Sequence, residues 1–248
     1  MNLYNYLAFL EFSDYNVNKK KKGVYNMEEL DIESRLVKFY SSQSNLVPLH
    51  AASGHFATSH SHINYYIDLT SLKTRVDEAK EVAKLIESGY RGSNKIIDTI
   101  VCMDGTETIG SFLGQEFEDH NYMTINKHET IYVVTPEYNR NNQLMFRDNI
   151  ARTIKGKNVL LLMATTTTGQ TIRRSMECIT YYQGTVVGVN SLFSTIDSID
   201  GTKVDYIFSP EDLPGYEAFE PRNCPFCKKK IQIEAMVNGF GYSKYMSF

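Results

Sequence analysis

The segment 158–171 constrains the fold of this chain more strongly than any other stretch of its sequence. It opens with the apolar run 159–162, which is typical of a short strand buried on both faces of a sheet. Four threonines follow at 165–168, then Gly169, and a helical pattern begins at Ile172. The segment therefore predicts a strand, a small hydroxyl-rich loop and the N-terminus of a helix.

A strand, loop and helix in this order form an anion-binding cradle in α/β proteins. The backbone N–H groups at a helix start have no intrahelical partner, the helix dipole favours negative charge, and threonine hydroxyls add donors. A glycine lets the backbone approach its ligand closely. We predict a phosphate site formed by Ala164, Thr165, Thr166, Thr167, Thr168, Gly169, Gln170 and Thr171. The alternative is a threonine-rich turn that caps the helix.

Strand and helix patterns alternate through the middle of the chain. Short apolar runs predict strands at 98–103, 130–134, 159–162, 185–190 and 204–208. Apolar residues at helical spacing predict helices over 71–90, 109–117 and 172–182. This alternation predicts an α/β fold with a doubly wound, mostly parallel, five-stranded sheet. Ligands of such a sheet bind beyond the carboxyl ends of its strands, where we expect the loops 104–108, 135–157 and 164–171 to gather.

The ends of the chain differ in composition from its middle. Residues 1–26 are rich in Tyr, Asn and Lys without clear periodicity, and we interpret them as a poorly ordered appendage or the product of an upstream start. An amphipathic helix is expected over 27–40, so we place the start of the folded domain at Met27 and its end at residue 215. Residues 216–248 then form a C-terminal extension.

Composition excludes several classes of function. Charged residues make up 22% of the chain and the net charge is -3, which predicts a soluble globular protein with no general attraction to nucleic acid. The sequence has no apolar run long enough to cross a membrane and no signal-peptide pattern at its start. Four cysteines without a secretion signal predict a reducing, cytoplasmic location.

Over about residues 45–208, the order of motifs resembles the type I phosphoribosyltransferase family, and within it the orotate phosphoribosyltransferases. The glycine–histidine–phenylalanine opening and tyrosine-rich strand of 54–68 resemble the N-terminal hood of that family. Segment 104–108 matches its pyrophosphate loop in position, and 135–157 its flexible catalytic loop. Segment 159–171 is similar to its motif for phosphoribosyl pyrophosphate (PRPP).

The resemblance implies a fold, an activity and a set of partners. The fold would carry a small hood built from residues 27–70, with C-terminal segments as a further candidate contribution. The activity would be the transfer of ribose 5-phosphate from PRPP to a pyrimidine base, orotate, with Mg²⁺ bridging pyrophosphate and ribose hydroxyls. A homodimer is implied as well, because enzymes of this family commonly share active sites between two subunits.

The resemblance also assigns roles to individual residues. The pyrophosphate loop would comprise Asp104, Gly105, Thr106, Glu107 and Thr108. Asp104 and Glu107 would bind Mg²⁺ or partly replace the acid pair of the family's PRPP motif. The alternative is that Asp104 and Gly105 form a turn and Glu107 favours the start of the next helix through its dipole. Arg140 and Arg147 would clamp pyrophosphate during catalysis, or else lie in a solvated loop with Arg147 paired to a neighbour.

Tyr65 and Tyr66 would stack on the base, although one of the two must face the core of a strand in any case.

The PRPP motif of this chain departs from the family at one informative point. The family ends its strand with two adjacent acids that hold the ribose hydroxyls, whereas Met163 and Ala164 occupy the corresponding positions here. Neither side chain accepts a hydrogen bond from a hydroxyl or stabilises positive charge on the ribose ring. The second hypothesis is therefore a catalytically weak or inactive protein that binds PRPP or a nucleotide on the same fold.

Cys224 and Cys227 form a Cys-x-x-Cys pair that supplies half of a structural zinc site. A histidine or a second subunit would have to complete the site, and the alternative is a reduced turn. A weaker hypothesis joins this pair to the basic N-terminal tail as a nucleic-acid contact, against which the net charge argues. The four histidines of 50–62 lack the spacing of a helical ligand pair, so we interpret them as polar or packed side chains rather than metal ligands.

Overall fold

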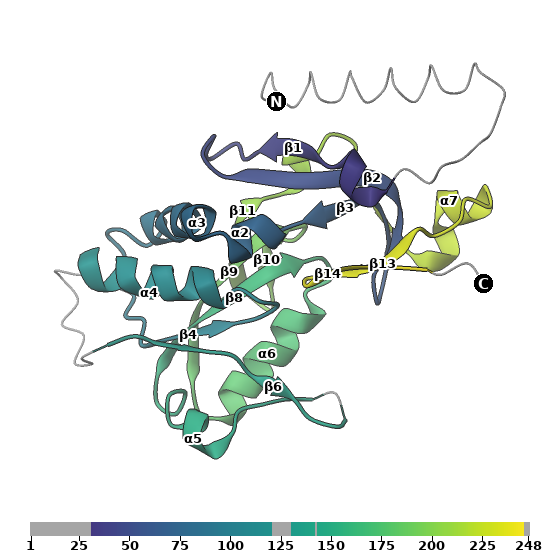
Figure 1. The fold of residues 1–248 in the computed structure, drawn as a ribbon. Coiled ribbons are helices and arrows are strands. Elements are labelled where there is room, and N and C mark those ends of the chain that lie inside the picture. Colours follow the sequence, from purple (N-terminus) through teal and green to yellow (C-terminus); the bar gives the residue numbers. More distant parts are fainter. Residues whose placement is uncertain (1–30, 121–129, 142, 246–248) are drawn as a thin grey trace. The chain divides into compact units, whose positions relative to one another are not determined.

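A computed structural model of the protein describes residues 31–120, 130–141 and 143–245 (Figure 1). It divides into two compact units. Unit 1 comprises Met1–Leu69 and Phe208–Phe248, and unit 2 comprises Thr70–Ile207. The predicted appendage 1–26 lies outside the described residues.

Unit 2 is built on a six-stranded sheet with the order β10-β11-β9-β8-β4-β5. The pairs β4–β5, β4–β8 and β8–β9 are parallel, while the short edge strand β10 is antiparallel to β11. The strands are β4 (Thr99–Cys102), β5 (Tyr132–Val134), β8 (Asn158–Thr166), β9 (Thr185–Ser194), β10 (Ser198–Ile199) and β11 (Thr202–Phe208). All five predicted strands are confirmed, and the sheet is mostly parallel as expected.

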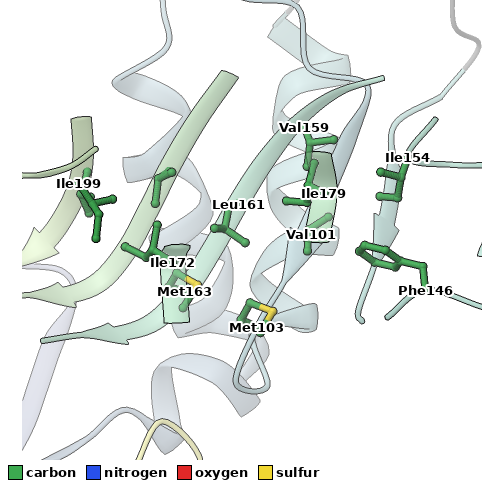
Figure 2. Close-up of a cluster of buried hydrophobic side chains, with 12 residues drawn as sticks. Val101, Met103, Phe146, Ile154, Val159, Leu161, Met163, Ile172, Ile179 and Ile199 are labelled. Atoms are coloured by element: carbon green, nitrogen blue, oxygen red, sulfur yellow. The ribbon is translucent and has the colours of Figure 1, made fainter. Parts of the chain in front are cut away.

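Helices cover both faces of this sheet. The helices of unit 2 are α2 (Thr70–Thr74), α3 (Val76–Ser88), α4 (Glu107–His120), α5 (Asp148–Ala151) and α6 (Gln170–Tyr181). On one face, Leu161 and Met163 of β8 join an apolar cluster with Ile172 of α6 (Figure 2). On the other face, Gly110 of α4 lies directly over Cys102 of β4. The doubly wound arrangement follows from the apolar run 159–164 in β8, because a stretch of strand with apolar side chains on both faces must be covered on both sides.

The prediction of one helix over 71–90 is wrong in one respect. Arg75 has an extended conformation, with φ −84° and ψ 126°, and separates α2 from α3. Its guanidinium pairs with Asp77 at 2.7 Å and with Glu78 at 3.1 Å, both in the first turn of α3. Acidic residues favour a helix N-terminus, and they stabilise a new start at Val76.

The polar segment 135–157 contains more structure than a single loop. Its strands β6 (Glu137–Tyr138) and β7 (Leu144–Met145) form a two-stranded antiparallel hairpin. The short helix α5 follows the hairpin within the same segment. Phe146 is buried against Tyr182, whose hydroxyl donates to the Phe146 carbonyl at 2.9 Å. The segment is therefore anchored to the end of α6 by an aromatic contact and a hydrogen bond.

Unit 1 combines the N-terminal hood with the C-terminal segment in one sheet. Its strand order is β12-β3-β2-β13-β14, with β1 paired to β2. The strands are β1 (Val37–Tyr40), β2 (Pro48–Ala57), β3 (His62–Asp68), β12 (Ala218–Phe219), β13 (Ala235–Asn238) and β14 (Gly241–Lys244). Short helices accompany them: η1 (Ile32–Arg35), η2 (Pro210–Asp212), η3 (Pro221–Asn223) and α7 (Pro225–Lys228).

The amphipathic helix predicted over 27–40 is wrong for its described part. Only the single turn η1 is helical, and the chain then continues as β1, antiparallel to β2 with Val37 opposite Ala51. Val37 and Phe39 are β-branched or aromatic residues that favour strands, and pairing with β2 outweighs the helical spacing. Residues 27–30 of this prediction lie outside the described part of the chain.

Within the described ranges, none of the helices combines the length and the apolar character that crossing a bilayer requires.

The packing of α4 on the sheet makes a testable prediction with a matched control. A Cβ atom at Gly110 would lie 2.4 Å from Cys102 Sγ, whereas at Gly114, one turn later, its nearest neighbour would be Val133 Cγ2 at 3.7 Å. We expect Gly110→Ala to lower the free energy of unfolding by about 1–3 kcal/mol through overpacking. Gly114→Ala should raise it by about 0.5–1 kcal/mol, because alanine favours a helix. Urea denaturation measures both, and equal effects would contradict this packing.

Candidate functional site

Two loops of unit 2 meet at the carboxyl edge of its sheet. Cys102 of β4 lies opposite Leu162 of β8, so the two strands deliver their following loops to the same place. The Met103 N–H donates to the Leu162 carbonyl at 2.9 Å. The buried hydroxyl of Thr106 contacts the carbonyls of Met103 and Leu162 at 2.9 and 3.3 Å. The loop 104–108 is thereby fixed beside the end of β8.

A third segment joins this edge. Thr135, directly after β5, donates its hydroxyl to Glu107 Oε1 at 3.0 Å. The loops 104–108 and 164–171 and the start of 135–157 therefore gather at one edge, as the parallel strand order requires.

The cradle after β8 has the conformation of an open helix N-terminus. Gly169 is the N-cap of α6, with φ 73°, and no side chain caps the helix. Thr168, Gln170 and Thr171 are exposed around it. Thr195 holds the preceding loop, donating its N–H to the Thr166 carbonyl at 3.0 Å and its hydroxyl to the Thr167 carbonyl at 2.8 Å. The N–H groups at the start of α6 thus have no side-chain cap and lie on a supported backbone.

Glycine is required at position 169 for two separate reasons. Its φ of 73° lies in the left-handed region, which is costly for residues with a Cβ. A Cβ atom there would also lie 2.2 Å from Ile199 Cδ1, a buried side chain of β10. The threonine-rich turn is therefore a specific structure in which glycine, not threonine, occupies the N-cap.

Met163 and Ala164 stand where an acid pair was expected from the resemblance. Both side chains are fully buried in β8. Met163 belongs to the apolar cluster under α6, near Ile172 and Ile199 (Figure 2). Strand β8 continues as far as Thr166, so the first polar side chains of the motif are the threonines. This edge of the sheet carries no carboxylate from β8.

Asp104 is the most perturbed acid at this edge. It adopts a left-handed conformation with φ 56°, and Lys73 Nζ donates to its carbonyl oxygen at 3.1 Å. Burial raises the pKa of the Asp104 carboxyl, the positive charge of Lys73 opposes that rise, and the negative charge of Glu107 adds to it. A partly buried acid beside a second acid is a common feature of functional sites.

Three residues at this edge were not predicted from the sequence. Lys73 is buried against the Asp104 backbone. Burial raises the pKa of the Tyr138 hydroxyl. The negative charge of Asp104 raises this pKa further and the positive charge of Arg174 lowers it, so both charged groups act on Tyr138. Arg174 is exposed and forms no ion pair with described residues, whereas its neighbour Arg173 binds Asp200 at 2.8 Å. The adjacent arginines early in a helix were a usable signal, because the helix dipole disfavours cations there.

The two predicted arginine clamps have different surroundings. Arg140 lies exposed in the turn of the β6–β7 hairpin and forms no ion pair within the described part of the chain. Arg147 pairs with Glu137 at 2.8 Å on the surface of the hairpin. Arg140 is therefore available for an anionic ligand, whereas Arg147 follows the alternative interpretation of a paired loop residue.

Tyr65 and Tyr66 are both packed inside unit 1. The Tyr65 hydroxyl donates to the Pro214 carbonyl at 3.2 Å, and its ring meets Phe39 edge-on. Tyr66 donates to Asp68 Oδ1 at 3.3 Å and packs in the apolar cluster of that unit. Their rings are used for packing, so we leave them out of the proposed binding site.

Cys224 and Cys227 lie in unit 1 beside two of the histidines. The structure brings two of the four histidines together, because the ring nitrogens of His55 and His62 lie 3.1 Å apart. The two residues approach each other across the β2–β3 hairpin, whereas the spacing along the sequence was tested only for a helix.

No protein-family model and no curated protein matches this chain. The orotate phosphoribosyltransferase of Mycobacterium tuberculosis is 15% identical, with a TM-score of 0.46 over 66% of this chain and 91% of that one. An adenine phosphoribosyltransferase from Thermoanaerobacter pseudethanolicus is 13% identical, with a TM-score of 0.44 over 72% of this chain and 97% of that one.

The UMP synthase of Leishmania donovani is 18% identical, with a TM-score of 0.48 over 66% of this chain and 34% of that one.

The raised pKa of Asp104 predicts a pH-dependent effect of Asp104→Asn. A carboxyl whose pKa is raised by folding destabilises the folded state when it ionises, so this cost appears as the pH rises through the raised value. Asparagine removes the charge and tolerates the left-handed conformation. We expect the variant to have a higher urea midpoint than the wild type at pH 7, with the gap closing as the pH falls below 3.8. A lower midpoint at pH 7 would contradict the assigned environment.

Proposed function

We propose that the carboxyl edge of the unit 2 sheet binds PRPP, and that the protein is a phosphoribosyltransferase of the orotate type. The observation that carries this proposal is the uncapped N-terminus of α6 behind the left-handed Gly169. Exposed Thr168 and Thr171 add hydroxyl donors around it. A phosphate group fits such a site because it accepts several N–H and O–H donors at once and carries the charge that the helix dipole favours.

The neighbouring loops suit the second anionic group of PRPP. Arg140 and Arg174 are exposed and have no ion-pair partner in the described ranges, so their guanidinium groups can bind phosphate oxygens without first breaking an ion pair. Lys73, beside the Asp104 backbone, adds positive charge. In this proposal the α6 N-terminus holds the 5-phosphate and the surrounding cations hold the pyrophosphate.

The residues of the 104–108 loop are compatible with Mg²⁺, which PRPP chemistry uses. Carboxylate oxygens are suitable Mg²⁺ ligands, and the negative charge of Glu107 raises the pKa of Asp104, so the two acids act on each other electrostatically. Asp104 and Glu107 would hold the ion together with oxygens of the substrate. When bound, it would neutralise charge on the pyrophosphate.

The proposed chemistry needs no covalent nucleophile. The bond between ribose C1 and pyrophosphate breaks, a bond from C1 to a nitrogen of the base forms, and pyrophosphate leaves. The residues of this edge would position the two phosphate groups and stabilise charge on the leaving pyrophosphate. By the stated resemblance, the proposal includes orotate as the base, a homodimer and a cytoplasmic location.

A second candidate is a protein that binds PRPP or a nucleotide with little turnover. Met163 favours it, because its side chain is enclosed in the apolar cluster under α6 and the strand offers no acid to the ribose hydroxyls. Introducing Asp at this position would bury a carboxylate among apolar side chains and destabilise the fold, so restoring the acid pair cannot distinguish the two candidates.

The variants Thr171→Glu and Thr171→Gln test the proposed phosphate site. Their new side chains have nearly the same size and differ by one negative charge. Thr171 is the second residue of α6, whose first turn has no acidic residue, so glutamate there stabilises the helix while repelling phosphate. PRPP at 100 times its Kd should stabilise the wild type by about 2.7 kcal/mol, or about 5 °C or more in Tm. We expect Thr171→Gln to keep most of this shift and Thr171→Glu to lose it. An unchanged shift in Thr171→Glu would place the phosphate elsewhere.

Turnover is tested by pyrophosphate release from PRPP with orotate and Mg²⁺. We expect release that depends on the base, and a loss of tenfold or more in kcat/KM for Arg174→Ala, equivalent to about 1.4 kcal/mol or more in transition-state stabilisation. Arg173→Ala is the matched control, since Arg173 is occupied by Asp200. PRPP binding without release for any common base would favour the second candidate over the first.

A further inference from the structure

Unit 1 gathers four metal-ligating side chains that the proposed function does not use. His55 lies in β2 and His62 begins β3, while Cys224 precedes α7 and Cys227 lies within it. One ligand atom from each residue lies within 4.8 Å of all the others. The residues come from a β-hairpin and a Cys-x-x-Cys turn that are separated by more than 160 positions in the chain.

The separations between these atoms fit a tetrahedral ion site. Zinc binds nitrogen at about 2.0–2.1 Å and sulfur at about 2.3 Å, so the edges of a zinc tetrahedron measure about 3.3–3.8 Å. The His55 Nε2–His62 Nδ1 distance is 3.1 Å and Cys227 Sγ lies 3.3 Å from His62 Nδ1. His55 Nε2 lies 3.4 Å from Cys224 Sγ and 3.7 Å from Cys227 Sγ. Four of the six edges therefore match within about 0.2 Å.

The hydrogen bond on the far side of His55 sets the tautomer that a metal requires. His55 Nδ1 lies 2.9 Å from the Ile231 carbonyl, which can only accept, so Nδ1 carries the proton. The other nitrogen, Nε2, then has a free lone pair directed at the cluster. Metal-bound histidines commonly donate their second N–H to such a carbonyl.

Hydrogen bonding alone does not account for this convergence. His55 Nε2 has one lone pair but three neighbours at contact distance, namely His62 Nδ1, Cys224 Sγ and Cys227 Sγ. One acceptor cannot satisfy three donors, whereas a cation in the centre is shared by all four groups.

The surroundings hold the ligands in place. Backbone hydrogen bonds tie His55 to Glu234, with its N–H donating to Oε1 at 3.2 Å and its carbonyl accepting from the Glu234 N–H at 2.8 Å. Phe226, between the two cysteines, stacks on the His55 ring at 5.2 Å. His55 and Cys224 are buried, and Cys227 is exposed, which leaves a route for the ion.

We propose that unit 1 binds a structural Zn²⁺ ion through His55 Nε2, His62 Nδ1, Cys224 Sγ and Cys227 Sγ. Two thiolates and two imidazoles in a tetrahedral set are typical of zinc, and four protein ligands leave no open position for catalysis. Binding displaces the two thiol protons into solvent. The ion joins the N-terminal hairpin to the C-terminal segment, and it stabilises a unit whose two parts are distant in sequence.

Metal analysis of the full-length chain tests this proposal. We expect about one zinc ion per chain after expression with zinc and desalting, measured by mass spectrometry of the metal. Cys227→Ser and His62→Ala should each lose the ion under the same conditions. Cys178→Ser is the matched control, because Cys178 lies in α6, outside the cluster, and its replacement should leave the zinc content unchanged.

Two further measurements use the wild-type chain and do not depend on the folding of any variant. Removing the metal with a chelator should lower Tm, and adding zinc alone should restore it. Cobalt in place of zinc should produce a thiolate-to-metal charge-transfer band. A chain that holds no zinc after expression with zinc and shows no such band would overturn the proposal, as would a Cys227→Ser variant that retains its zinc.

Discussion

The parallel hydrogen-bonded ladder through β5, β4, β8 and β9 is the constraint on which the candidate site depends. Parallel neighbours end at the same edge of a sheet, so the ladder delivers the loops after β4, β5 and β8 to one place. The Met103 N–H bond to Leu162 and the Thr106 hydroxyl then hold the first of these loops against β8. The loops 104–108 and 164–171, which we assign to PRPP and Mg²⁺, take their positions from this ladder.

Two features near the end of β8 are unfavourable for stability. Gly169 leaves the α6 N-terminus uncapped, although a Ser, Thr, Asn or Asp N-cap would contribute about 0.5–2 kcal/mol of helix stability. Asp104 is held in a left-handed conformation with a raised pKa, which is also unfavourable for folding at neutral pH. Costs of this kind are characteristic of functional sites. Met163, by contrast, stabilises the fold, because its side chain is enclosed in the core. That side chain has no group that could accept a hydrogen bond from a ribose hydroxyl.

The strands of the sheet could be predicted from the sequence because they are short apolar runs, which are typical of parallel strands buried on both faces. It failed where local pattern and long-range pairing disagree. Residues 37–40 have helical spacing but pair with β2, and Arg75 interrupts a regular helical pattern. The open form of the cradle could be anticipated from the strand, the glycine and the helical period, whereas the electrostatic effect of Arg174 on Tyr138 could not.

The cluster of His55, His62, Cys224 and Cys227 in unit 1 also depends on long-range pairing that the local sequence pattern does not show. Cys224 and Cys227 are adjacent enough in sequence to be recognised as a pair, but His55 and His62 reach them only because β2 and β3 form a hairpin in the same unit. The ion pair between Arg35 and Glu234 links the same two parts of the chain. Contacts between two segments so far apart in the chain cannot be predicted from the spacing of residues along the sequence.

The central claim is that the start of α6 binds a phosphate of PRPP. Titration of ¹⁵N-labelled protein with PRPP and Mg²⁺, followed through backbone amide resonances, tests it most directly, because the N–H groups themselves are the proposed donors. We expect the largest shifts on the amides of Gly169, Gln170 and Thr171, and no change in these amides on addition of unphosphorylated ribose. Binding of PRPP without shifts at these amides would contradict it.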